Sequence, residues 1–368
     1  MIRSTRRSRR RLVLAAVAIA SAAGAYGAFR HYLLPGLVLL HGLEATDPPE
    51  EPPPPSWTQE EVHVPGPAGP MRVRVLRPAE PRARLLVLVH GVQADGIDGE
   101  RMTRFSRRLV ELGHPVVIPE IRDLQEIELE ARSVDEIEAA VRWAFDLAGG
   151  SRVGLLGASI GGGFAVAAAG RPSIRDRIAL VVSLGGHADL TSLVDYLLSG
   201  RLEDGSTREP HAYAVETLAH AFAERLVPPE QVRPFKACLL ATLRDEDATA
   251  QELASRLPSP AAELARLAIE RRGGELGRAI APALEGLSFD PGMSPLTAPV
   301  PSCPVFLLHG THDDLIPASH AVRLHDRLAR TTDCSLLVTP LVGHADFTGE
   351  DWWELIQVAA FLTAILRV

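Results

Sequence analysis

Several residue types are scarce or missing in this chain of 368 residues. It has no asparagine, so it offers no N-glycosylation sequon, and Lys236 is its only lysine. Three cysteines are too few for a disulfide framework. No group of histidines and cysteines has the spacing of zinc ligands, and no glycine-rich loop has the pattern that cradles phosphate groups. The sequence therefore predicts neither a metal site nor a bound cofactor.

Basic charge is concentrated at the N-terminus. The net charge is −8, yet the first 29 residues contain six arginines and no acidic residue. Without these six positive charges, the net charge of residues 30–368 alone is −14. A body with this much negative charge repels a phosphate backbone, so nucleic acid is not an expected partner.

An uncharged run from Leu12 to Phe29 follows the arginines. At about 1.5 Å per residue in a helix it would span about 27 Å, close to the thickness of a bilayer core. We therefore predict that residues 1–30 form a basic N-terminus and a transmembrane anchor. The positive-inside rule then places the N-terminus in the cytoplasm and the rest of the chain in a periplasm or outside the cell. The alternative is a signal peptide cleaved near Ala22, which would release a secreted protein.

Residues 31–56 contain a second apolar patch, over 32–43, and then a proline-rich run over 47–56. The prolines favour an extended polyproline II conformation, which would act as a semi-rigid spacer. A globular domain is expected over residues 57–368.

The body alternates between short apolar runs and amphipathic stretches. Such alternation predicts an α/β fold in which helices cover both faces of a mostly parallel sheet. We expect early strands at about 61–65, 71–77 and 84–90, a helix over 98–112, a strand over 115–119, a helix over 134–148 and a strand over 178–183.

The pattern Gly-x-Ser-x-Gly occurs at Gly157-Ala-Ser159-Ile-Gly161, directly after an apolar run. A helix-forming stretch over 164–169 follows at once. This arrangement is typical of a nucleophile elbow, in which the serine lies on a strained turn and its neighbours two residues away must be small. Ser159 is therefore the candidate nucleophile, and an ordinary turn between a strand and a helix is the alternative.

A candidate oxyanion hole comes from the end of an earlier strand. The apolar run over 85–89 ends in His90-Gly91, where the chain can turn sharply. The N–H of Val92 can then point towards the elbow. Together with the N–H of Ile160, the residue after the serine, it would stabilise a developing oxyanion.

A candidate acid and a candidate base follow the last two strands. Asp313 lies in the turn after an apolar run that ends at His309, and His344 follows the run over 334–339. The chain order is thus serine, aspartate, histidine. Asp314 competes with Asp313 for the acid position, and the alternative for Asp314 is a cap of the following helix.

These motifs together resemble those of the α/β-hydrolase superfamily, in particular serine esterases and lipases. The resemblance covers roughly residues 60–368, less an insert. The spacing that the family shows around its acidic residue selects Asp313. It implies that Ser159 attacks a carbonyl carbon, that His344 takes the serine proton, and that Asp313 orients the imidazole. Serine at the elbow, where related dehalogenases and epoxide hydrolases carry aspartate, implies acyl transfer.

Ser159 and Asp313 are 154 residues apart, more than the intervening strand and helices need. The surplus, about 189–298, has helical periodicity and is rich in alanine, leucine, glutamate and arginine. We interpret it as a helical cap over the active site, and a helical excursion at the side of the sheet is the alternative. The resemblance also makes Cys303 and Cys334 neighbours, either paired or as buried free thiols.

The resulting hypothesis is a membrane-anchored serine hydrolase that cleaves carboxylic esters through an acyl-enzyme on Ser159. Its substrate would be a small-molecule or lipid ester. Two alternatives use the same fold. One is an acyltransferase, in which an alcohol replaces water as the acceptor, and the other is a non-catalytic binding protein tethered to the membrane.

Overall fold

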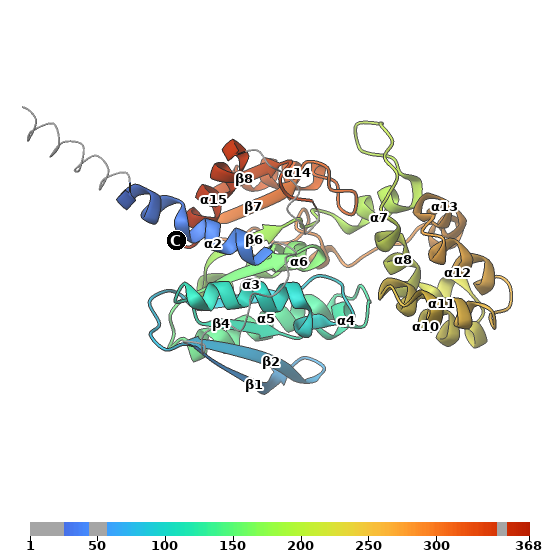
Figure 1. Cartoon of the computed structure of the whole chain (residues 1–368), viewed down its shortest axis with the longest axis horizontal. Helices are drawn as coiled ribbons and strands as arrows, with labels where there is room; N and C mark the ends of the chain where they lie inside the picture. The colour runs from blue at the N-terminus through green and yellow to red at the C-terminus, as the bar shows by residue number, and fades with distance from the viewer. Residues whose placement is uncertain (1–25, 44–56, 344–351) are drawn as a thin grey trace, which may run out of the picture.

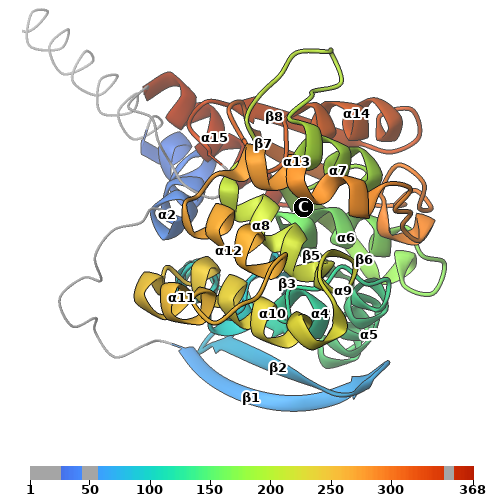
Figure 2. The same cartoon turned by 90° about the vertical axis from the view of Figure 1, so that its right-hand side faces the viewer.

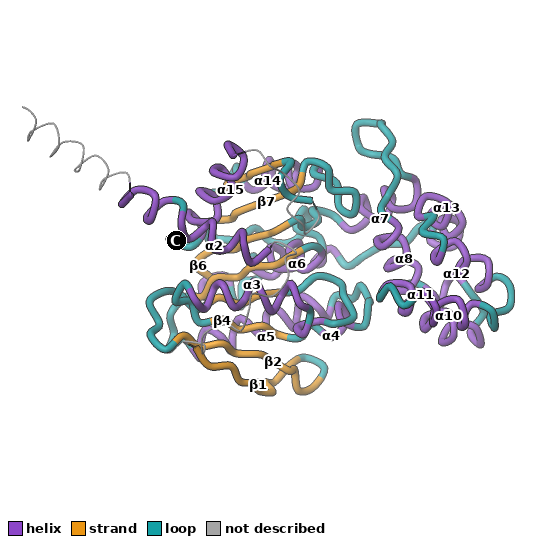
Figure 3. The backbone as a smooth tube through the Cα atoms, viewed as in Figure 1, coloured by secondary structure: helices purple, strands orange, loops and turns teal. Residues whose placement is uncertain are grey.

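The computed structural model describes residues 26–43, 57–343 and 352–368. Within them the chain forms an eight-stranded sheet in the order β1-β2-β4-β3-β5-β6-β7-β8 (Figure 3). β1 pairs antiparallel with β2, β2 pairs antiparallel with β4, and the other neighbours are parallel. The strands are β1 (Trp57–Gly66), β2 (Gly69–Pro78), β3 (Leu86–Val89), β4 (Val116–Pro119), β5 (Val153–Ala158), β6 (Ile178–Leu184), β7 (Val305–Gly310) and β8 (Cys334–Thr339). The expected α/β fold with a mostly parallel sheet is confirmed.

Apolar residues along the central strands divide the core between the two faces of the sheet. In β3, Val87 and Val89 belong to one core cluster, whereas Leu86 and Leu88 belong to the other. Successive side chains of a strand point to opposite faces. A strand that is apolar at every position must therefore be covered on both sides.

Helices supply that cover on each face (Figure 1). The larger core cluster takes its helical residues from α5, α6 and α14, together with helices of the insertion, and the smaller one from α2, α3 and α15. These helices are α2 (Leu34–Leu43), α3 (Glu100–Glu111), α5 (Arg132–Leu147), α6 (Ile160–Ala169), α14 (Ser319–Leu328) and α15 (Trp352–Ile365).

The chain between β6 and β7 leaves the sheet and forms a group of helices at one end of it, on the right in Figure 1 and towards the viewer in Figure 2. We call residues 189–298 the cap. Its helices are α7 (Leu190–Ser199), α8 (Ala212–Ala221), α9 (Ala223–Leu226), α10 (Pro229–Leu243), α11 (Asp247–Ala254), α12 (Ala261–Ile269) and α13 (Gly273–Leu284).

The two connections of the cap to the sheet are bonded to each other. The N–H of Leu296 donates to the carbonyl of Ala188 at 3.0 Å. The N–H of Leu190 donates to Ser294 Oγ at 3.1 Å. The cap therefore leaves and rejoins the sheet through one bonded stem.

The described part of the N-terminal region packs on this body. Helix α2 lies against α3 and α15, and its Leu39 and Leu40 are only 1% and 2% exposed. The N–H of Gly36 donates to Thr363 Oγ1 in α15 at 2.9 Å. The apolar patch expected next to the anchor is thus packed into the smaller core cluster.

Most of the predicted anchor and all of the proline-rich spacer lie outside the described residues. Of the uncharged run that ends at Phe29, the structure describes only residues 26–29. Among the described residues, no helix combines the length and apolar character that crossing a membrane requires.

Two glycines near the N-terminal end of the described chain should respond differently to replacement by alanine, because only Gly36 lies in the contact between α2 and α15. A Cβ added at Gly36 would lie 1.9 Å from the Ala359 carbonyl oxygen, which no packing adjustment within the helices can absorb. Gly36→Ala is therefore expected to destabilise the protein by about 1–3 kcal/mol. A Cβ at Gly27 meets nothing within 4 Å, so Gly27→Ala is expected to have no effect or to add about 0.5–1 kcal/mol through helix propensity.

Urea unfolding of the two variants in the same detergent checks this prediction. Equal stability of the two variants would show that α2 does not contribute to the fold.

All three cysteines are free thiols, and all lie in the described residues. Cys303 lies two residues before Val305 of β7, which pairs with Cys334 of β8. Burial raises the pKa of the thiols of Cys238, Cys303 and Cys334 to about 11. Of the two alternatives for Cys303 and Cys334, the structure has the free thiols, and their raised pKa makes them poor nucleophiles.

Candidate functional site

Ser159 occupies a strained turn between β5 and α6. Its φ is 54° and its ψ is −135°, in a region that side-chain-bearing residues seldom adopt. A Cβ at Gly157 would lie 2.3 Å from the Gly161 carbonyl oxygen, and a Cβ at Gly161 would lie 2.1 Å from the His90 carbonyl oxygen. Only glycine fits at either position, which explains the spacing of the motif.

The His90-Gly91 loop lies directly against the serine. A Cβ at Gly91 would lie 2.9 Å from the Ser159 Cβ. The N–H groups of Val92 and Ile160 both belong to this contact region, and neither donates to another backbone carbonyl in the described part of the chain. Ile160 is the first residue of α6, and a helix N-terminus favours negative charge, so its amide, together with that of Val92, could serve an oxyanion.

Asp313 is buried in the turn after β7, and backbone amides fix its carboxylate. Its Oδ1 accepts hydrogen bonds from the N–H groups of Leu315 and Ile316 at 3.0 and 2.9 Å. Its Oδ2 lies 3.3 Å from Nε2 of the buried His309. His309 Nε2 is also 2.7 Å from the Ile316 carbonyl oxygen, to which it donates. His309 therefore shapes the turn that carries Asp313.

Asp314 has a different environment. It is half-buried, and its backbone carbonyl accepts hydrogen bonds from the Tyr196 hydroxyl at 3.0 Å and from the His211 N–H at 3.1 Å. Helix α14 begins at Ser319 with Ala318 as its N-cap, so Asp314 does not cap it. The interpretation of Asp314 as a helix cap is wrong.

The third member of the predicted triad, His344, lies outside the described residues, which end at Gly343 before resuming at Trp352. The structure thus describes Ser159, Asp313, Val92 and Ile160, while the base stays a prediction from the sequence.

Ser159 lies in the wall of a cavity of about 880 Å³ between the sheet and the cap. Most of the wall is apolar. The cap contributes Leu190, Leu193, Leu197 and Leu218 to it. A cavity of this size and character suits a small molecule or a chain of apolar groups.

Polar residues of the cap lie in another part of the cavity wall. They include Arg271 and Asp245, which form an ion pair with each other. Arg271 Nη1 also donates to Oε2 of the buried Glu216 at 2.7 Å. Burial raises the pKa of Glu216 to about 7. This ion-pair network joins α8 to the C-terminal ends of α10 and α12, and so stabilises the cap beside the cavity.

Four buried histidines are neutral and serve as structural hydrogen-bonding groups. His90 Nδ1 donates to the Gly91 carbonyl at 2.7 Å, and its Nε2 accepts from the Ile121 N–H at 3.1 Å. His320 Nδ1 accepts from the Ala188 N–H at 3.1 Å. Burial lowers the pKa of His90, His187 and His220 to about 4 and that of His320 to about 3.

These histidines predict that the protein loses stability as the pH falls from about 6.5 to about 4. In that window the unfolded chain protonates the four imidazoles and the folded chain does not, so protons favour unfolding. Glu136 and Glu216 oppose this, because burial raises the pKa of each to about 7 and the folded chain binds their protons first. Four sites outweigh two, so the urea midpoint should be lower at pH 4.5 than at pH 7. A midpoint that is constant over this range would contradict the prediction.

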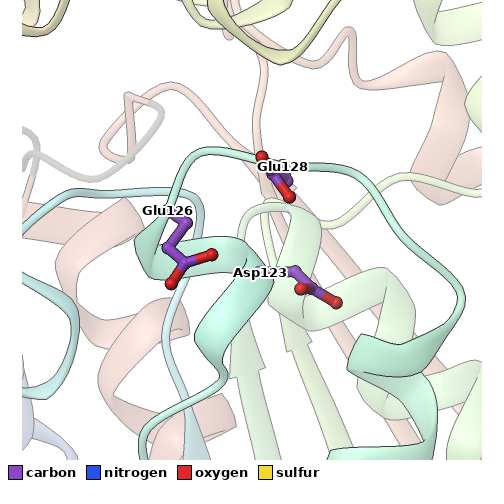
Figure 4. A group of neighbouring side chains, drawn as sticks. All are labelled: Asp123, Glu126 and Glu128. Atoms are coloured by element: carbon purple, nitrogen blue, oxygen red, sulfur yellow. The ribbon is translucent and has the colours of Figure 1, made fainter. Parts of the chain in front are cut away.

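Three carboxylates near the short helix α4 (Arg122–Gln125) come together outside this cavity (Figure 4). Ligand atoms of Asp123, Glu126 and Glu128 lie within 4.8 Å of one another. Arg132 Nε donates to Asp123 at 3.2 Å, and Lys236 Nζ lies 3.5 Å from Glu128. Two of the three carboxylates therefore have cationic partners from the protein itself.

Cap residues that contact the loops of the candidate site residues were missed by the sequence analysis. Tyr196, Arg208, His211 and Tyr213 each bond to the loop of Val92 or to the turn of Asp313. They belong to no motif, and their placement depends on how a long insertion folds back over the sheet. No local pattern in the sequence identifies them.

The sheet order, with a serine turn after β5, is that of the α/β-hydrolase fold. No protein-family model matches the sequence, and no curated protein matches it. Among solved structures the chain is similar to an esterase of Pyrococcus furiosus, with 13% identity, a TM-score of 0.47, and coverage of 85% of this chain and 93% of that one.

Two other solved structures are similar over most of their length. Brefeldin A esterase, a bacterial homologue of human hormone-sensitive lipase, has 16% identity and a TM-score of 0.48, with 90% of this chain and 86% of that one covered. An esterase of the archaeon Pyrobaculum calidifontis has 18% identity and a TM-score of 0.45, with 89% and 90% covered.

Proposed function

We propose that this chain is a serine hydrolase that cleaves carboxylic esters through an acyl-enzyme on Ser159. The observation that carries the proposal is the strained serine at φ 54° in the wall of the cavity, beside the amides of Val92 and Ile160, which donate to no backbone carbonyl among the described residues. Strain of this kind costs on the order of 1–3 kcal/mol and persists where function requires it. A simple packing turn would need neither the strain nor the serine.

In the proposed reaction the Ser159 hydroxyl attacks the ester carbonyl carbon and gives its proton to His344. The N–H groups of Val92 and Ile160 stabilise the resulting oxyanion. His344 then protonates the leaving alcohol, and water hydrolyses the acyl-enzyme by the reverse sequence. Asp313 would orient the imidazole and balance its positive charge.

The apolar cavity supports esters with a substantial apolar part, and lipid esters are among the candidates. If the cap excludes water from the cavity, the local dielectric constant falls, and the hydrogen bonds to the oxyanion become stronger.

The proposal also includes a place in the cell. The arginines and the uncharged run that ends at Phe29 support a membrane anchor with a cytoplasmic N-terminus, and a hydrolase domain in the periplasm or outside the cell. Protease added to spheroplasts should then degrade the domain. Protection until lysis would place the domain in the cytoplasm, and a mature N-terminus near Ala23 would identify a cleaved signal peptide.

Labelling with a fluorophosphonate probe tests the activity. The wild-type protein should be labelled and should hydrolyse p-nitrophenyl esters, with a preference that an acyl-length series defines. Ser159→Ala should be neither labelled nor active. A folded wild-type protein that resists the probe and all the esters would overturn the proposal, and transfer to an added alcohol in preference to water would identify an acyltransferase.

A further inference from the structure

A short segment of the cap contacts both loops that carry the candidate catalytic groups. Arg208 Nη1 donates to the Asp313 carbonyl at 3.1 Å, and the His211 N–H donates to the Asp314 carbonyl at 3.1 Å. Two residues further on, the Tyr213 hydroxyl donates to the Val92 carbonyl at 3.1 Å. The start of α8 is thus joined to the acid turn on one side and to the oxyanion loop on the other.

Tyr213 completes the support of one particular peptide group. In the peptide between Val92 and Gln93, the Gln93 N–H donates to the Leu124 carbonyl at 3.1 Å. The carbonyl of the same peptide accepts the bond from Tyr213. The body of the protein therefore holds one side of this peptide, and the cap holds the other.

The orientation of this peptide controls the neighbouring N–H of Val92, because only two backbone torsions separate them. Gly91 on the other side adds no side chain that could restrict the loop, and it must be a glycine since a Cβ there would lie 2.9 Å from the Ser159 Cβ. Tyr213 lines the same cavity as Ser159. Burial raises the pKa of Tyr213, which keeps the hydroxyl protonated and able to donate.

We infer that Tyr213 is a positioning residue for the oxyanion hole: through the Val92 carbonyl it holds the loop whose N–H receives the oxyanion. The inference rests on the proposed serine hydrolase function. It gives the cap a second task besides shaping the cavity, because the oxyanion hole has its full geometry only when α8 is docked.

Tyr213→Phe tests the inference in the full-length protein, since it removes one hydroxyl and keeps the ring in the cavity wall. We expect kcat to fall about 3- to 10-fold while KM changes less than about twofold, because the lost hydrogen bond matters when the oxyanion forms. A trifluoromethyl ketone adds to the serine and places an oxyanion in the hole. Its inhibition constant should rise by the same factor as kcat/KM falls.

Tyr196→Phe is the matched comparison, because it removes a hydroxyl that donates to the Asp314 carbonyl instead. Amide hydrogen exchange distinguishes the two variants without any turnover. In Tyr213→Phe the amides of residues 93–96 should exchange at least about threefold faster, and in Tyr196→Phe the acceleration should fall on residues 313–316.

The outcomes separate this inference from the proposed function. If Ser159→Ala abolishes activity but Tyr213→Phe matches the wild type in kcat and in inhibitor affinity, the inference fails and the function stands. If the wild-type protein is inactive, the proposed function is wrong. Amide hydrogen exchange over residues 93–96 then decides by itself whether Tyr213 holds the loop. Unchanged exchange there would overturn the inference in either case.

Discussion

Replacing Ser159 by alanine is expected to lower kcat for ester hydrolysis by about 10⁴-fold or more, because it removes the hydroxyl that we propose forms the acyl-enzyme. Alanine keeps the Cβ, so the strained backbone at φ 54° is retained and the protein should fold normally. KM for a substrate that still binds should change little. Ser255→Ala, which alters an exposed serine of the cap, is the control and should leave kcat unchanged.

The backbone strain at Ser159 can be tested by a second measurement, the stability of the variants. Ser159→Gly should be as inactive as the alanine variant but more stable than it by about 1 kcal/mol or more, because glycine adopts positive φ without a steric penalty. Chemical denaturation of the two variants measures the difference. Residual activity above about a hundredth of the wild type in either variant would show that Ser159 is not the nucleophile.

The second large effect concerns the two neighbouring aspartates. Asp313→Asn is expected to lower kcat by about 10⁴-fold, since an amide cannot balance the charge of an imidazolium. Its carbonyl oxygen can still accept the bonds from the N–H groups of Leu315 and Ile316, so the turn should keep its shape. The amide nitrogen then takes the place of an acceptor oxygen beside His309.

Asp314→Asn is the matched control for this comparison. The contacts of Asp314 with Tyr196 and His211 use its backbone carbonyl and survive the substitution. Its kcat should stay within about tenfold of the wild type. The reverse ranking of the two variants would assign the acid to Asp314.

The strands around the site could be predicted because their sequence carries local constraints. The run that leads to Ser159 is apolar at most positions, and the glycines at 157 and 161 are required by contacts of 2.3 and 2.1 Å that a Cβ would make. Gly91 is also required to be a glycine, because its loop can lie against the serine only when this residue has no side chain. Gly157 meets a residue four positions away, whereas Gly161 and Gly91 mark the close approach of two loops that are distant in the sequence, and each loop carries its own glycine motif.

The cap and α2 could be predicted only in part. Helical periodicity marks residues 189–298 as helices, but the bonds from Arg208 and Tyr213 to the loops depend on the folded position of α8. For α2, the apolar patch is visible in the sequence, whereas its contact with α15 joins Gly36 to Thr363, 327 positions apart. Long-range docking of this kind leaves no local pattern.

The bonded stem of the cap makes this insertion exchangeable. Because the carbonyl of Ala188 and the N–H of Leu296 are 3.0 Å apart, the ends of any replacement segment already meet. Closing the chain there with a segment of different length costs little entropy, and β6 and β7 need not move. Replacing the cap by other segments would therefore give this sheet cavities for different esters. Each replacement segment would have to supply its own hydrogen-bond donor to the Val92 carbonyl.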